Sequence, residues 1–181
     1  TDQINALELV VARQPEPPVV VAHSGAGRVI TGALDRQPRA VRRVVYVDSG
    51  PAADGTSFDD SLPDDEASVP LPPWDAFRAE GLLDGLDAEQ LDTFRARAVP
   101  VPGGVVREQL HLHDDRRLDV PTTIIASSLP SAQMLELARE GHPMFAEVDR
   151  LRDLEAVDLP TGHWPMWSRP TDLADAIAAT A

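Results

Sequence analysis

The feature that most constrains this chain is a short apolar run that ends in a serine set among very small residues. Residues 18–27 read Pro-Val-Val-Val-Ala-His-Ser-Gly-Ala-Gly, and Ser24 directly follows the run. Consecutive β-branched residues bounded by proline and glycine are typical of a buried strand in a parallel sheet. A helix that leaves such a strand abruptly needs small residues at the corner. The sequence therefore predicts a strand over 19–22, a sharp turn at Ser24 and a helix over 25–35.

Ser24 stands in a degraded form of the G-x-S-x-G pattern, in which a strained strand-to-helix turn exposes a nucleophilic serine. The two glycine places hold Ala22 and Ala26, which are the smallest departure available, and glycines at 25 and 27 keep the backbone unobstructed. A serine in such a turn can also cap the helix or line a phosphate site. A phosphate loop would need a lysine or a dinucleotide glycine pattern, and the chain has neither. We interpret Ser24 as a nucleophile.

The candidate base for this serine is a histidine near the other end of the chain. A nucleophilic serine needs an imidazole that takes its proton, and that imidazole can be distant in sequence. His163 lies in a tight Pro-Thr-Gly-His-Trp-Pro loop between the apolar run 154–159 and the helical pattern 171–179. We predict a strand and a helix for these two patterns and interpret His163 as the general base.

The order of these motifs resembles that of the α/β-hydrolase superfamily, and the resemblance covers nearly all of the 181 residues. It implies an α/β fold with a mostly parallel sheet flanked by helices and a short helical cap insertion. It also implies that the backbone N–H of Gly25 is one donor of an oxyanion hole. The second donor normally comes from a loop before the nucleophile strand, which this sequence does not contain. Members of the superfamily carry further strands before the nucleophile, so we expect an N-terminal segment to precede Thr1.

The acid that would orient His163 departs from the usual pattern of the superfamily. The carboxylate usually follows the strand that corresponds to 122–126, but here the sequence continues Ser-Ser-Leu-Pro and contains no acid. Some relatives use the end of the preceding strand instead, and Asp48 occupies that place after the apolar run 44–47. There it could hold the imidazole in the required tautomer. The alternative is an aspartate that only organises its own loop.

Periodicity places the remaining core elements on both sides of a long insertion. Residues 51–119 are rich in proline and acidic residues, and Asp87 to Gln90 have capping-box spacing ahead of a helix. Such a length is unusual for a plain surface loop. We therefore predict an α/β-hydrolase core over 1–50 and 120–181 and a cap or lid over 51–119. The other predicted core elements are helices at 2–13, 131–139 and 143–152 and strands at 44–47 and 120–126.

Composition excludes several kinds of chemistry. All 16 basic residues are arginine, so a Schiff-base lysine, a pyridoxal enzyme and a Walker A loop are excluded. The chain has no cysteine, which excludes disulfides, cysteine nucleophiles and thiolate metal sites. A net charge of −14 disfavours nucleic acids and anionic membrane surfaces as partners. No apolar stretch approaches the roughly 20 residues of a membrane span. We expect a soluble, cytoplasmic protein. An N-terminal segment and a second copy of the chain both remain open as binding partners.

One further motif suggests a metal. His111, His113 and Asp115 form H-x-H-x-D, which resembles part of a binuclear zinc site. That motif continues with a histidine, whereas this chain continues with Arg116, a cation that cannot bind a metal ion. We therefore favour a solvated loop of the cap over a metal site.

The residues together lead us to predict a serine hydrolase that cleaves a small carboxylic ester or a lactone through an acyl-enzyme. Ser24, His163 and Asp48 would act, Gly25 would stabilise the oxyanion, and no cofactor or metal is implied. We expect His23, Trp74 and Trp164 to line the substrate pocket, although ordinary packing explains aromatic residues equally well. Two alternatives stay open: a hydroxynitrile-lyase-like enzyme, which generally needs a lysine, and a catalytically silent binding protein.

Overall fold

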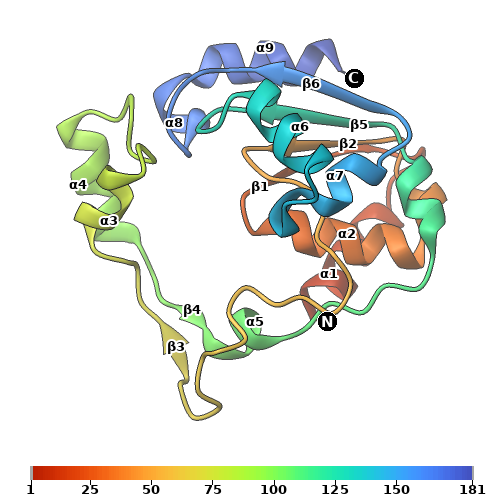
Figure 1. Ribbon diagram of the computed structural model, residues 1–181, viewed down its shortest axis with the longest axis horizontal. Coiled ribbons are helices and arrows are strands. Elements are labelled where there is room, and N and C mark those ends of the chain that lie inside the picture. The colour runs from red at the N-terminus through yellow and green to blue at the C-terminus, as the bar shows by residue number, and fades with distance from the viewer. Residues whose placement is uncertain (1, 181) are drawn as a thin grey trace.

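The centre of the molecule is a four-stranded parallel sheet with strand order β1-β2-β5-β6 (Figure 1). The computed structural model describes residues 2–180. The strands are β1 (Val19–His23), β2 (Arg43–Val47), β5 (Thr122–Ala126) and β6 (Leu154–Asp158). All three neighbouring pairs are parallel, so the loops that follow the strands meet at one edge of the sheet. The predicted parallel sheet is confirmed, and every strand lies within two residues of its expected bounds.

The two central strands are apolar on both faces because helices cover both sides of the sheet. Val44, Val45 and Ile125 are fully buried or nearly so, which explains the uninterrupted apolar runs in the sequence. β1 lies at one end of the strand order, and Val21 there is 45% exposed. The strand that carries the Ser24 turn is thus less covered than β2, the strand with which it pairs.

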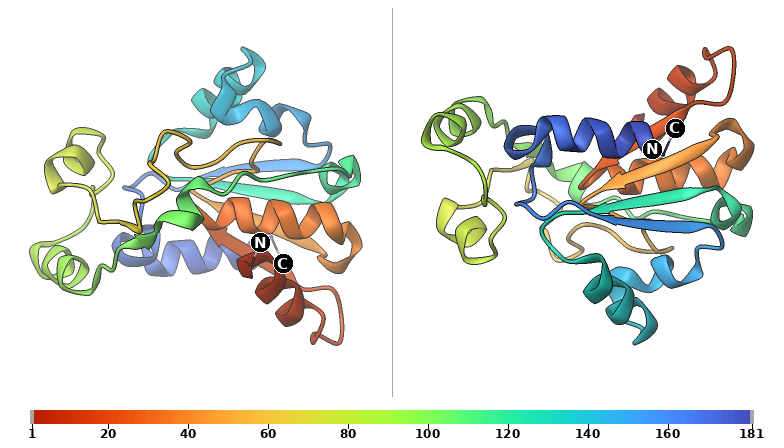
Figure 2. Two further views of the ribbon diagram at one scale, coloured as in Figure 1. Left: turned by 90° about the horizontal axis from the view of Figure 1, so that it is seen from below. Right: turned by 90° about the horizontal axis from the view of Figure 1, so that it is seen from above.

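Helices form two layers on the sheet. α2 (Ala26–Arg36), α6 (Ser131–Arg139) and α7 (Ala146–Arg150) share one hydrophobic cluster with Val44 and Ile124 of the sheet. α1 (Asp2–Val11) packs on α2 in the same cluster. α9 (Pro170–Ala179), which follows the short helix α8 (Pro165–Ser168), packs on the other face against Val45 and Val47. Figure 2 shows α9 and the α6–α7 pair on opposite sides of the sheet.

The segment between β2 and β5 carries its own small elements. They are β3 (Ser68–Val69), α3 (Trp74–Ala79), α4 (Ala88–Arg97), β4 (Val101–Pro102) and α5 (Gly103–Arg107). β3 and β4 pair in an antiparallel manner, which the sequence did not predict. The predicted capping box is present, because Asp87 accepts the N–H of Gln90 while the Gln90 side chain accepts the N–H of Asp87. α3 and α4 lie beside α8, at the end of the sheet where the strand loops meet (Figure 1).

The end of this segment belongs to the packing of the main core. Leu110 and Leu112 are buried in the cluster that contains α2 and α6. These contacts join the end of the segment to the core. The division into a core and a cap over 51–119 stays a prediction. The predicted helix over 143–152 consists of a 3-10 turn (Pro143–Phe145) followed by α7. Within residues 2–180, none of the helices combines the length and apolar character needed to cross a bilayer.

Candidate active site

The turn after β1 has the strained backbone that the sequence led us to expect. Ser24 has φ 51°, in the left-handed region that side chains other than glycine rarely adopt. The turn is held by the Ser24 N–H, which donates to Val47 O at 3.3 Å, and by Ser49 Oγ, which donates to Ser24 O at 2.6 Å. Gly25 is the N-cap of α2, so its N–H points out of the helix start. The turn forms with alanine at both glycine places of the pattern.

Three side chains from three loops form one hydrogen-bonded chain at this edge of the sheet. His163 Nε2 lies 2.8 Å from Ser24 Oγ, and His163 Nδ1 lies 2.5 Å from Asp48 Oδ2. Since Asp48 can only accept, His163 donates from Nδ1–H, and Nε2 accepts the hydroxyl proton of Ser24. Residues separated by 139 positions in sequence therefore meet within hydrogen-bond distance. The structure brings together the three residues that the sequence singled out.

Asp48 is held by donors from the loop that lacks an acid. It has φ 43° directly after β2, and its side chain is 8% exposed. Oδ1 accepts the backbone N–H groups of Ser127 and Ser128, and Oδ2 accepts Ser128 Oγ as well as His163 Nδ1. Burial favours the neutral acid, but the hydrogen bonds from His163 and Ser128 outweigh it and hold the pKa of Asp48 well below its usual range. Asp48 is therefore a fixed negative charge behind the imidazole.

His23 lies behind the His163 loop and does not line the cavity. Its Nε2–H donates to the backbone carbonyl of His163 at 2.7 Å, and the two imidazole rings are 4.7 Å apart. Burial lowers the pKa of His23, although the hydrogen bond to His163 opposes the shift. We expected His23 in the substrate pocket. The ring instead faces the His163 backbone, because its Nε2–H is bound by the carbonyl oxygen there.

A cavity of about 670 Å³ opens onto Ser24, Gly25 and His163. Most of its wall is apolar. Its larger apolar side chains come from β5, from α6, from the segments that follow β5 and α6, and from the segment between β2 and β5: Phe58, Leu82, Ile124, Leu129, Met134 and Phe145. A pocket of this size and character suits a small organic molecule with a few polar groups at one end. The polar groups at that end are the Ser24 hydroxyl and the His163 imidazole.

Trp74 and Trp164, which the sequence placed in the substrate pocket, lie elsewhere. Both pack against Phe94, at ring-centroid distances of 5.1 Å for Trp74 and 4.7 Å for Trp164. Phe77 joins the same group, 5.5 Å from Trp164. These rings pack against one another where α3 and α4 meet the loop that carries His163, and they do not line the cavity. Leu82, which lies between α3 and α4, does line the cavity.

The sequence model of the Alpha/beta hydrolase family matches residues 1–176. The chain belongs to this family. A curated relative, the carbendazim hydrolyzing esterase of Nocardioides sp. (strain SG-4G), is 27% identical over 97% of this chain and 76% of its own length. This alpha/beta hydrolase family member thus resembles its relative along almost the whole of the described sequence.

Solved structures share the fold of this alpha/beta hydrolase family member at low sequence identity. An extracellular alpha/beta-hydrolase from a Paenibacillus species matches with a TM-score of 0.73, 17% identity, and coverage of 98% of this chain and 78% of that one. The methylesterase MES16 from Arabidopsis matches with a TM-score of 0.70, 16% identity, and coverage of 97% and 75%. A pyrethroid hydrolase from Sphingobium faniae matches with a TM-score of 0.63, 20% identity, and coverage of 97% and 74%.

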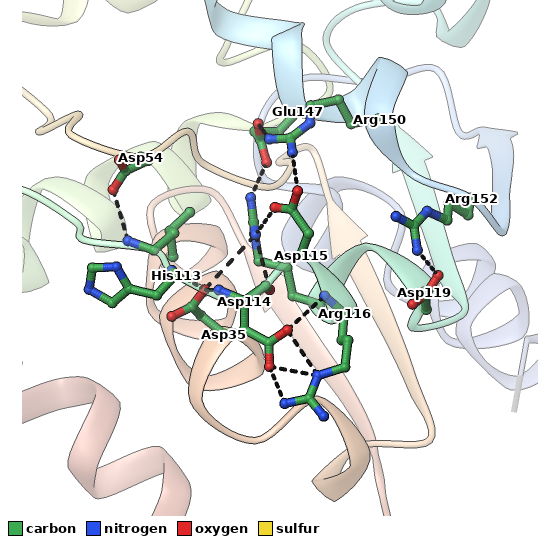
Figure 3. Close-up of polar contacts among 12 residues, drawn as sticks. Asp35, Asp54, His113, Asp114, Asp115, Arg116, Asp119, Glu147, Arg150 and Arg152 are labelled. Carbon is green, nitrogen blue, oxygen red and sulfur yellow. Dashed lines mark hydrogen bonds and ion pairs between the residues drawn. The ribbon is translucent and has the colours of Figure 1, made fainter.

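The H-x-H-x-D segment does not line the cavity, and Figure 3 shows His113 beside Asp35 of α2. The side chains of His111 and His113 are exposed, and the His113 N–H donates to Asp35 of α2 at 2.7 Å. Asp115 instead accepts from Arg117 at 2.8 Å. Among the described residues, no group of three or more potential ligands is arranged to hold a metal ion. The segment therefore anchors the chain to α2 through backbone and arginine contacts, and it is less a free cap loop than we expected.

Proposed function

We propose that this protein is a serine hydrolase that cleaves small carboxylic esters or lactones. The single observation that carries the proposal is the hydrogen-bonded chain from Asp48 through His163 to Ser24 at the mouth of an apolar cavity. Such a chain supplies a nucleophile, a base and a charge that fixes the tautomer of the base. The names of the relatives agree with this class, since they include an esterase, a methylesterase and a pyrethroid hydrolase.

The proposed reaction has two halves. Ser24 Oγ attacks the carbonyl carbon while His163 Nε2 takes its proton, and the carbonyl oxygen becomes an oxyanion that faces the N–H of Gly25. The imidazolium forms beside the ionised Asp48, which stabilises it. When the C–O bond to the leaving group breaks, His163 returns the proton to the alcohol. Water then gives a proton to His163 and attacks the acyl carbon, which releases the acid and restores Ser24.

The cavity indicates which esters would suit the site. Its larger side chains are apolar, so an acyl or alcohol group of a few carbons would replace water there at a gain of about 0.8 kcal/mol per buried CH₂. The volume of about 670 Å³ is within the range of small-molecule pockets. A lactone presents the same carbonyl and would keep its alcohol tethered after ring opening.

Labelling of Ser24 tests the proposal directly. We expect a fluorophosphonate probe to modify Ser24 in the protein, and peptide mass spectrometry to locate the adduct on that residue. Ser24→Ala should abolish labelling and lower kcat/KM for p-nitrophenyl butyrate by about 10⁵-fold or more. Ser57→Ala is the matched control, because it removes a cavity hydroxyl that bonds neither His163 nor Asp48. Protein that is folded yet unlabelled, or Ser24→Ala protein that still labels, would overturn the proposal.

A further inference from the structure

The cap and the loop that carries His163 are joined by main-chain hydrogen bonds. The N–H of His163 donates to Leu82 O at 2.8 Å, and the N–H of Gly162 donates to Asp84 O at 3.0 Å. The Thr161 hydroxyl donates to the same Asp84 oxygen at 3.3 Å. We call residues 82–84 together with residues 161–163 the seam. Through the seam, the residue proposed as the base is hydrogen-bonded directly to the cap.

The close approach of the two segments of the seam depends on Gly162. A Cβ placed on Gly162 would lie 2.7 Å from both Asp84 N and Asp84 O, and it would also collide with Leu82 O. These are backbone atoms, which cannot turn aside as a flexible side chain can. Any side chain at position 162 must therefore push the cap and the histidine loop apart.

The backbone of His163 is held from two directions. Its N–H is bound by Leu82 of the cap, whereas its carbonyl accepts the Nε2–H of His23 from β1 at 2.7 Å. One partner belongs to the cap and the other to the sheet that also carries Ser24. The direction in which the imidazole leaves the backbone is therefore fixed jointly by cap and core, and a shift of the cap turns the ring relative to Ser24 and Asp48.

Aromatic packing extends the same connection beyond the seam. The Trp164 ring meets the His163 ring edge-on at 4.9 Å and also contacts Phe77 and Phe94 of the cap helices. Gln90 of α4 donates from Nε2 to Trp167 O at 2.9 Å. Both α3 and α4 are thus fastened to the segment that follows His163.

We propose that Gly162 is a positioning residue and that the seam sets the orientation of the His163 imidazole. The kinetic part of this inference rests on the proposed function, whereas the geometric part does not. Leu82 adds a route for the substrate, because its carbonyl binds His163 while the residue also lines the cavity. An acyl or alcohol group that packs on the Leu82 side chain therefore contacts the seam. A change in the position of Leu82 would shift the His163 backbone through the hydrogen bond between them.

Gly162→Ala tests the seam, with Gly104→Ala as the matched control. Gly104 lies in α5 with no atom within 4 Å of a Cβ placed on it, so the same substitution meets nothing there. We expect Gly162→Ala to lower kcat by about 100-fold while KM changes less than about threefold, because a misplacement near 1 Å at a reacting group costs about that factor. Gly104→Ala should leave both constants unchanged. Equal constants in the two variants would overturn the proposal.

A second measurement reads the geometry without any substrate. The short hydrogen bond from His163 Nδ1 to Asp48 should give a far-downfield proton resonance, which His163→Gln removes and thereby assigns. We expect the resonance to shift or broaden in Gly162→Ala and to stay unchanged in Gly104→Ala. If the protein hydrolyses no ester but the resonance responds to Gly162→Ala, the proposed function fails and the positioning role stands. A resonance identical in all but His163→Gln contradicts the positioning role.

Thr161→Val keeps the proposal falsifiable if Gly162→Ala does not fold. Valine has nearly the shape of threonine but cannot donate to Asp84 O, so it weakens the seam without a backbone collision. It also removes the 2.7 Å contact of Thr161 with Ser168 Oγ, which Ser168→Ala removes on its own as the control. We expect a several-fold loss of kcat and a smaller displacement of the same proton resonance. A wild-type kcat together with a wild-type resonance in folded Thr161→Val protein would rule out the seam as the positioning element.

Discussion

Two groups of charged side chains are buried in this molecule, and they are built differently. The first consists of Ser24, Asp48 and His163 at the loop edge of the sheet. The second centres on Arg117, whose side chain is 5% exposed and binds Glu147 and Asp115 at 2.8 Å each. Arg150 binds Glu147 and Asp115 in turn (Figure 3). In the second group every charge faces an opposite charge, whereas the first ends in a neutral hydroxyl that faces a cavity.

Backbone strain separates the two groups further. Ser24 and Asp48 are the non-glycine residues with positive φ within the described part of the chain, and both belong to the first group. A residue held in that region costs about 1–3 kcal/mol, and the surrounding structure must outweigh it. The Arg117 group has no such residue and gains from matched charges. The comparison indicates that the first group is arranged for reaction and the second for anchoring, and mutations can test that division.

After Ser24→Ala, the largest expected effect is on activity, from Asp48→Asn. Asparagine tolerates the positive φ of this position but cannot hold the imidazole in the tautomer that accepts the Ser24 proton. We expect kcat/KM for a p-nitrophenyl ester to fall by about 10⁴-fold, which corresponds to about 5.5 kcal/mol in the barrier. Folded Asp48→Asn protein that keeps a tenth of the wild-type activity would place the orienting charge elsewhere.

The stability of the same variant depends on pH in a defined direction. The pKa of Asp48 is lowered on folding, so its ionised form stabilises the native state above the usual aspartate pKa of about 4. That contribution is lost as the pH falls toward the folded-state pKa, at about 1.4 kcal/mol per unit of pKa difference. The free energy of unfolding of wild type relative to Asp48→Asn should therefore decrease below pH 4 in urea titrations.

The next largest expected effect is on stability, from Arg117→Leu. This substitution leaves Glu147 and Asp35 buried with fewer positive partners, and breaking a buried ion pair costs about 3–5 kcal/mol. The control is Arg116→Leu, because Arg116 binds Asp114 at 2.6 Å while its side chain is 68% exposed, and exposed pairs contribute about 0–1 kcal/mol. We expect urea unfolding to separate the two variants clearly and kcat of folded Arg117→Leu to stay within about threefold of wild type. Equal losses of stability would contradict the division.

Much of the core followed from local patterns in the sequence. The buried runs of β2 and β5 were visible as short stretches rich in β-branched residues, and the helix over 131–139 has the expected bounds. The capping box at Asp87 located the start of α4, because side-chain caps are local interactions. The order of Ser24 and His163 along the chain resembles that of one superfamily, and this resemblance predicted which residues form the site.

The parts that were missed depend on contacts between distant segments. β3 and β4 are two residues long, and a pair of that length carries no periodicity, since Val69 and Val101 meet only in the folded chain. The seam escaped for the same reason, although a glycine directly before His163 was a signal of close backbone approach. The Ser127-Ser128 pair was interpreted only as a missing acid, whereas both residues donate hydrogen bonds to the acid that replaces it. The prediction for His23 rested on its position beside Ser24, and that for Trp74 and Trp164 on their aromatic side chains.

The smallest expected effect comes from His23→Gln. It tests the hydrogen bond between His23 of β1 and the backbone of His163. Burial lowers the pKa of His23 below its usual value of about 6.5. Below that pH the unfolded chain binds a proton at His23 more readily than the native protein does. The free energy of unfolding of wild type therefore decreases as the pH falls from about 6.5 toward the folded-state pKa. Glutamine keeps an N–H that can donate to His163 O but does not titrate, so the free energy of unfolding of the variant should fall less over that range in parallel urea titrations. His23→Leu removes the donor and should lower kcat, whereas His23→Gln should retain it. Identical pH profiles of stability for wild type and His23→Gln would mean that protonation of His23 costs no folding free energy. The His23 ring would then be packed less closely against His163 than the distances imply.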